Sequence, residues 1–182
     1  MKQRRSFESL GRVLAVDPRS RRAAWSYFKD GQLEDCQVRT FRRESVSARV
    51  ERDIVPYLGD LLDLHAPHAL LIPRIAGAGS RRRSKHSAAA IRGVVRAALE
   101  RGIAVHVVGT DTVKDALSQL NASPIRNNQE INELVLGHFP ELTMMVPAPR
   151  EKIWQPEQYF APLFNTVAMY LAWEHRLSPI GT

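Results

Sequence analysis

The amino-acid sequence predicts an α/β fold, a mixed sheet of three antiparallel strands followed by parallel strands, with helices on both faces. Three short strand-like runs follow one another between residues 12 and 40, with no segment between them long enough for a helix. Later apolar runs are separated by helix-length segments, as crossovers between parallel strands require. A doubly wound parallel sheet is the alternative, but it would need a crossover of about a dozen residues after Phe28.

Apolar runs and turn residues place the strands. The opening strands are expected at residues 12–16, 23–28 and 33–40, and Asp30-Gly31 is a typical hairpin turn between the second and the third. Continuous apolar runs at 68–72 and 103–108 are typical of parallel strands that are buried on both faces. The chain therefore begins with hairpins and continues with crossovers.

Helical periodicity predicts helices at residues 46–64, 84–101, 111–120, 128–138 and 157–175. Pro56 predicts a kink in the first helix, and Gly102 ends the second. A Gly-rich turn, Ala76-Gly77-Ala78-Gly79, precedes the second helix, and a Pro-rich connector at 146–156 precedes the last. We expect one domain over residues 12–176, with a basic tail at 1–11 and a C-terminal tail at 177–182.

The composition indicates a protein that folds alone and binds a polyanion. Of the 182 residues, 44% are hydrophobic, which is enough for a sizeable core. The 26 Lys and Arg residues exceed the 19 Asp and Glu residues, and the formal charge of +7 favours nucleic acid as a partner. Cys36 is the only cysteine, which excludes a disulfide framework and fits a reducing cytoplasm. No apolar run approaches the ~20 residues of a membrane span, so we expect a cytoplasmic protein with no membrane partner.

A single carboxylate stands at the end of the first apolar run, in the segment Val16-Asp17-Pro18-Arg19-Ser20-Arg21. An Asp-Pro pair after a strand is commonly only a turn residue that caps the backbone. Together with its flanking strands, however, this segment resembles the IDPGSR opening of RuvC-type Holliday-junction resolvases, which have a ribonuclease H-like fold. The resemblance implies that Asp17 is a catalytic residue and the first ligand of a Mg²⁺ or Mn²⁺ ion.

Further stretches resemble the same RuvC-like group and extend the resemblance over most of residues 12 to 175. They are Gly79-Ser80-Arg81-Arg82-Arg83, Asn128-x-Glu130-Ile131, the run from His138 to Leu142, the segment from Pro147 to Trp154, and Phe164-Asn165. The resemblance implies DNA rather than RNA as the partner, and a homodimer as the assembly.

The chain departs from the pattern of that group at the other acidic positions. The acidic pair after the tryptophan is Glu157-Gln158 here, and the Phe-Asp-Ala that follows is Phe164-Asn165-Thr166. The second carboxylate of the group falls at Pro73 or Arg74. Two-metal phosphodiester hydrolysis needs several carboxylates that converge on ions ~4 Å apart. We therefore take Asp17, Glu157 and Asn165 as the catalytic positions and expect weakened or lost metal-dependent cleavage.

Two other functions remain open from the sequence. One is an active Mg²⁺- or Mn²⁺-dependent endonuclease that uses Asp17 with Glu157 and with Glu130 or Glu133. The other is a structural subunit whose RuvC-like surface docks a protein partner. Metal-dependent cleavage identifies the endonuclease, and salt-dependent binding of branched nucleic acid argues against the structural subunit.

Cations near the Gly-rich turn and near Asp17 are the candidate phosphate contacts. The arginine run stands where that turn enters a helix, and cations there oppose the helix dipole unless an anion is bound. A solvated helix start is the simpler alternative. Of the three tryptophans, Trp154 is expected to stack a base, whereas Trp25 is a weaker candidate and Trp173 is expected in the core. The predicted nucleic-acid-binding residues are Arg19, Arg21, Arg81, Arg82, Arg83, Lys85 and Trp154.

Overall fold

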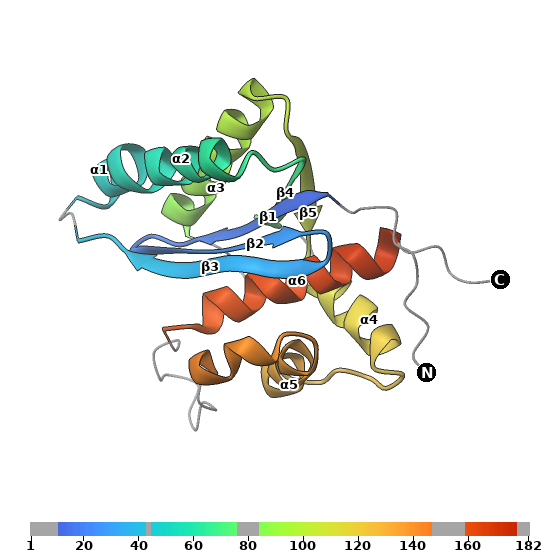
Figure 1. The fold of residues 1–182 in the computed structure, drawn as a ribbon. Helices are drawn as coiled ribbons and strands as arrows, with labels where there is room; N and C mark the ends of the chain where they lie inside the picture. The colour runs from blue at the N-terminus through green and yellow to red at the C-terminus, as the bar shows by residue number, and fades with distance from the viewer. Residues whose placement is uncertain (1–10, 43–44, 76–83, 147–158, 178–182) are drawn as a thin grey trace.

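The computed structural model describes residues 11–42, 45–75, 84–146 and 159–177, which form a mixed sheet with helices on both faces (Figure 1). Its strands are β1 (Arg12–Pro18), β2 (Arg22–Lys29), β3 (Gln32–Thr40), β4 (Ala69–Pro73) and β5 (Ala104–Val108). They lie in the order β3-β2-β1-β4-β5. The pairing is antiparallel among β1, β2 and β3, and parallel from β1 to β4 and from β4 to β5. The predicted fold class is therefore confirmed.

The helices form one layer on each face of the sheet (Figure 1). The first layer comprises α1 (Val46–Arg49), the π-helical segment η1 (Val50–Ile54), α2 (Val55–His65) and α3 (Lys85–Glu100). The second comprises α4 (Thr110–Leu120), α5 (Asn128–His138), the 3₁₀ segment η2 (Pro140–Met145) and α6 (Ala161–Leu177). Within the described ranges, none of these helices has the length and apolar character needed to cross a membrane.

The hairpin between β2 and β3 turns at Asp30-Gly31, as predicted. Both residues have positive φ, 49° at Asp30 and 85° at Gly31. Such a turn twists in the same sense as the strands that it joins, and Asp-Gly tolerates the left-handed backbone that it needs. The local sequence therefore fixes the point at which the sheet reverses.

Two helices differ from the sequence prediction. The predicted helix at 46–64 is interrupted by η1, which ends two residues before Pro56. A proline has no N–H to donate to the turn before it, so that turn is the weakest part of the helix. The predicted start of the last helix at Glu157 is wrong, because Tyr159 and Phe160 form a turn and α6 begins at Ala161. The Tyr159 hydroxyl donates instead to the carbonyl of Val38 on β3 (2.8 Å).

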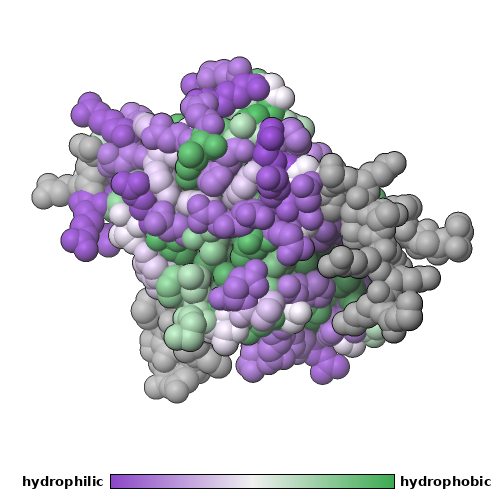
Figure 2. Space-filling model, in the orientation of Figure 1, coloured by the Kyte–Doolittle hydropathy of each residue, from purple (hydrophilic) through white to green (hydrophobic). Residues whose placement is uncertain are grey.

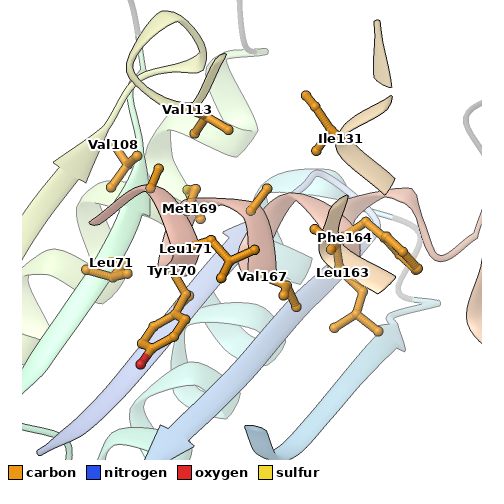
Figure 3. Packing of buried hydrophobic residues seen from close by; sticks show 14 of the residues in the cluster. Leu71, Val108, Val113, Ile131, Leu163, Phe164, Val167, Met169, Tyr170 and Leu171 are labelled. Atoms are coloured by element: carbon orange, nitrogen blue, oxygen red, sulfur yellow. The ribbon is translucent and has the colours of Figure 1, made fainter. Parts of the chain in front are cut away.

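The core consists of two buried clusters, one on each side of the sheet. Because side chains alternate along a strand, Val13 and Ala15 of β1 join the cluster under α4, α5 and α6, whereas Leu14 and Val16 join the cluster under η1, α2 and α3. In Figure 3, apolar side chains of α6 extend toward the strands. Among the buried contacts of α6, the Tyr170 ring stacks on Phe28 of β2 with 3.6 Å between ring centroids. β1 is thus covered on both faces.

A buried pair of hydroxyls fixes α6 on the sheet. Ser26 of β2 donates to the Oγ1 of Thr166 at 2.8 Å, and Thr166 donates to the carbonyl of Leu163 at 2.7 Å. Neither Ser26 nor Thr166 has exposed surface. A buried hydroxyl without a partner is costly, so this pair favours one position of α6 along β2. Asn165 precedes Thr166, and its place relative to β1 is set by this contact.

We predict opposite effects for two glycine-to-alanine substitutions in helices. A methyl carbon at Gly93 of α3 would lie 2.5 Å from a methyl carbon of Val55, whereas nothing lies within 4 Å of one at Gly137 of α5. Gly93→Ala should lower the free energy of unfolding by about 1–3 kcal/mol through overpacking. Gly137→Ala should raise it by up to about 1 kcal/mol, because alanine favours the helix. Urea denaturation of the two variants measures both, and equal effects would contradict the close packing of α3 on α2.

We also predict that Thr166→Val lowers the free energy of unfolding by about 1–3 kcal/mol, because it leaves the buried Ser26 hydroxyl without its acceptor. The matched control is Ser26→Ala combined with Thr166→Val, which removes both polar groups. The double variant should be less destabilised than the sum of Thr166→Val and Ser26→Ala, as measured by urea denaturation. Strict additivity would show that the two hydroxyls are not coupled.

Candidate functional site

The register between β1 and β4 determines which residue neighbours Asp17. Ala15 pairs with Leu71 in parallel register, so continuing by two residues sets Asp17 beside Pro73 at the carboxyl ends of both strands. By alternation, both lie on the face that α6 covers. Of the two positions proposed for the second carboxylate, Pro73 has the same offset from the last β1–β4 pair as Asp17, and Arg74 lies one residue further. Neither position carries an acidic group.

Arg74 is directed elsewhere, toward the junction of β5 and α4. Its backbone N–H donates to the carbonyl of Val108 (3.2 Å). Its guanidinium lies so close to Gly109 that a Cβ there would come within 3.0 Å of Cζ. Glycine at position 109 therefore leaves room for a cation beside the start of α4.

Asp17 is fully buried, and its carboxylate is held by Arg19. The Nε of Arg19 donates to both carboxylate oxygens, at 3.1 and 3.0 Å, and Nη2 donates to Oδ2 at 2.7 Å. The backbone of the same turn closes through a hydrogen bond from the Arg19 N–H to the carbonyl of Arg22 (2.8 Å). A guanidinium of the chain itself therefore compensates the charge of the proposed metal ligand.

Asn165 also faces Asp17, but as a donor. Its side-chain Nδ2 lies 3.4 Å from Oδ2 of Asp17, and the residue itself is exposed on α6. A metal ligand would present its carbonyl oxygen instead, since hard cations take oxygen ligands. The structure thus brings Asn165 of α6 to Asp17, in a contact that contains one carboxylate.

The described residues do not fit a two-metal centre. In ranges 11–42, 45–75, 84–146 and 159–177, no three His, Cys, Asp or Glu side chains are grouped to hold a metal ion. Glu130 accepts hydrogen bonds from the Arg126 N–H (2.7 Å) and the Asn127 side chain (2.9 Å) at the start of α5. Glu133 accepts one from Gln129 (3.1 Å). The described contacts of Glu130 and Glu133 are thus with residues in or beside α5, and their role at Asp17 stays a prediction; Glu157 lies outside the described residues.

A group of arginines surrounds this edge of the sheet. The Phe41 N–H donates to the carbonyl of Arg21 (2.8 Å), which holds the turn after β1 against the end of β3. The buried side chain of Arg49 donates to the carbonyl of Ser20 (2.9 Å). Figure 2 shows mostly hydrophilic side chains over α1 and α2, next to this edge. The described arginines of the edge are Arg19, Arg21, Arg22, Arg42, Arg49 and Arg74.

The start of α3 has the basic character that the sequence predicted. Ser84 caps the helix by accepting a hydrogen bond from the Ser87 N–H (3.2 Å), Lys85 is exposed, and the first turn has no acidic residue. The run Arg81-Arg82-Arg83 and Trp154 lie outside the described residues, so their roles remain predictions.

Trp25 is unavailable for base stacking. It is buried beneath α2, where its Nε1 donates to the hydroxyl of Tyr57 (2.7 Å). Trp173 packs against the core cluster of α6, which agrees with its expected place.

Sequence reasoning predicted that Arg19 binds a phosphate and missed that its guanidinium forms an ion pair with Asp17. A signal was present, because a lone buried carboxylate needs a compensating charge and Arg19 is the nearest cation along the chain. The direction of its side chain, however, is set by the turn of the backbone and cannot be read from the spacing.

No family model matches the chain, and neither does any curated protein. Among solved structures, Thermus thermophilus RuvC in complex with Holliday junction substrate has a TM-score of 0.66 and 18% identity, over 92% of this chain and 96% of that chain. Another structure of T. thermophilus RuvC has a TM-score of 0.65 and 19% identity, over 90% and 93% of the two chains. The yeast mitochondrial Holliday junction resolvase Ydc2 has a TM-score of 0.59 and 11% identity, over 92% and 82%. At such identities, the likeness establishes the fold alone.

The five-stranded mixed sheet with helices on both faces is compatible with the fold of these neighbours. The chain therefore has the RuvC-like form of the ribonuclease H-like fold.

Proposed function

We propose that the protein binds branched DNA through the arginine-rich edge of its sheet and has weak or no metal-dependent cleavage activity. The observation that carries the proposal is the pairing of the Asp17 carboxylate: Asp17 is buried, is held by Arg19 and faces the side-chain amide of Asn165. DNA binding does not require the missing acidic ligands, because phosphates would be contacted by the arginines of this edge.

The support for DNA binding is electrostatic. The chain carries a net charge of +7, and Arg21 and Arg42 are exposed near the end of β1 and after β3. Arginine fits phosphate oxygens well, since its planar guanidinium can donate two parallel hydrogen bonds. Phosphate contacts position a protein without reading bases. A branched substrate is proposed because one structural neighbour is complexed with a Holliday junction substrate.

The support for weak cleavage is chemical. Metal-assisted hydrolysis needs ions that activate the water and stabilise the leaving oxygen, and these ions are held by several carboxylates. Among the described residues no three His, Cys, Asp or Glu side chains are grouped to hold a metal ion, and the carboxylate of Asp17 is already paired with a cation. The protein would then recognise a junction without cutting it.

We predict that the wild-type protein leaves a labelled four-way junction uncut in Mg²⁺ or Mn²⁺ under conditions in which it binds that junction. Strand cleavage is measured on denaturing gels, with T. thermophilus RuvC as the positive control. Robust cleavage that Asp17→Asn abolishes would contradict the proposal and support the active endonuclease.

We predict that Arg21→Ala/Arg42→Ala reduces the slope of log K against log salt on a four-way junction by about 2 units, if each cation neutralises one phosphate. The matched control is Lys29→Ala/Arg176→Ala, which removes two exposed cations from the opposite end of the sheet, beside the Asp30-Gly31 turn and at the end of α6. The control should keep the wild-type slope in fluorescence anisotropy titrations. Equal slopes for the two variants would reject this edge as the DNA-binding surface, and no junction binding by any of the proteins would favour the structural subunit.

A further inference from the structure

Asp17 carries the one fully buried carboxylate at the edge of the described sheet, and the fold must supply a charge to balance it. A buried ion is tolerated when it is paired and its hydrogen-bonding capacity is used. In a metal-dependent nuclease the balancing charge comes from divalent ions. Here the contacts of Asp17 come from the chain itself.

The geometry of Arg19 fits that role closely. Three nitrogen-to-oxygen contacts, between 2.7 and 3.1 Å, join its guanidinium to the carboxylate. The side chain of Arg19 is only 28% exposed, and that of Asp17 only 1%. A guanidinium keeps its charge at every pH at which the protein folds, so the compensation does not depend on conditions.

The backbone holds Arg19 in place. Its N–H is bonded to the carbonyl of Arg22, and the next residue, Ser20, accepts a hydrogen bond from the buried Arg49. Because hydrogen bonds hold the turn at both points, folding itself places the Arg19 side chain beside Asp17. A divalent ion from solution would have to displace a cation that is attached two residues away and already desolvated.

We propose that Arg19 is the resident cation of this site and takes the place that a divalent metal ion would hold, so that Asp17 does not bind Mg²⁺ or Mn²⁺. This inference deepens the proposed function and rests on it. A phosphodiester bound at this edge would contact a guanidinium rather than a metal ion. The test of this inference needs no nucleic acid.

The test is a double-mutant cycle on the full chain, in EDTA, with Asp17→Asn, Arg19→Gln and the combined variant. Each single substitution breaks a buried ion pair and should lower the Tm by roughly 6 °C or more. The combined variant should lose clearly less than the sum of the two. A matched control is Asp63→Asn, because Asp63 forms the same kind of contact with Arg101 (2.7 Å) but is 63% exposed. It should change the Tm by no more than about 3 °C.

The opposite sign for Asp17→Asn would overturn the proposal. If Asp17 were an empty metal ligand, its carboxylate would be uncompensated, and neutralising it would raise the Tm. Additive losses in the cycle would likewise show that Arg19 does not stabilise the carboxylate.

The second arm uses Mn²⁺ alone, and its main readout is the wild-type protein, with Asp17→Asn compared below its own Tm. Isothermal titration calorimetry of the wild-type protein with millimolar Mn²⁺ should show no binding that is lost in Asp17→Asn, and added Mn²⁺ should leave the wild-type Tm unchanged. An Asp17-dependent rise in Tm with Mn²⁺ would refute the resident cation, even if junction binding were normal. Conversely, failure to bind any junction would overturn the proposed function and leave both arms of this test intact.

Discussion

Asp17 stands at the end of a strand that has no exposed face, and much of the site follows from that constraint. β1 is covered by η1, α2 and α3 on one side and by α6 on the other, so the residues that surround its carboxyl end are those that the sheet and α6 deliver. At Asp17 itself the contact from α6 is Asn165, and the end of β4 is Pro73; neither residue is anionic. The charge of Asp17 is therefore balanced by Arg19, from the turn that leaves the strand.

The position of α6 depends on contacts that differ in kind along its length. Near its start, Thr166 meets Ser26 through a buried hydrogen bond, and further along Tyr170 stacks on Phe28. Beyond Tyr170, its hydroxyl donates to Glu174 (3.2 Å), and burial raises the pKa of that carboxyl. The polar contacts specify register and the apolar ones supply most of the burial, since hydrogen bonds have a smaller net effect than the loss of apolar surface from water. Asn165 is exposed beside Asp17 as a consequence of this register.

Local patterns predicted most of the secondary structure, because the strands and most helices have strong periodicity and clear ends. The Asp30-Gly31 turn and the Ser84 cap are examples in which a short-range rule was sufficient. The start of α6 was predicted at Glu157 and lies at Ala161, because the chain before it is held by Tyr159 against β3. A contact across 121 residues overrode a helix-start signal that was purely local.

The sequence by itself determined the order of strands and helices, the basic charge and the absence of acidic residues at Pro73 and Asn165, because these depend on composition and on spacing along the chain. The tertiary structure decided that Arg74 is directed to the end of β5 and that Asn165 faces Asp17, since these follow from how strands and helices pack. It also decided that Trp25 is buried and that Arg19 turns back onto Asp17. Those outcomes depend on which side chains are in contact across the sheet and around a turn. Such contacts are set by packing and by backbone direction rather than by residue type.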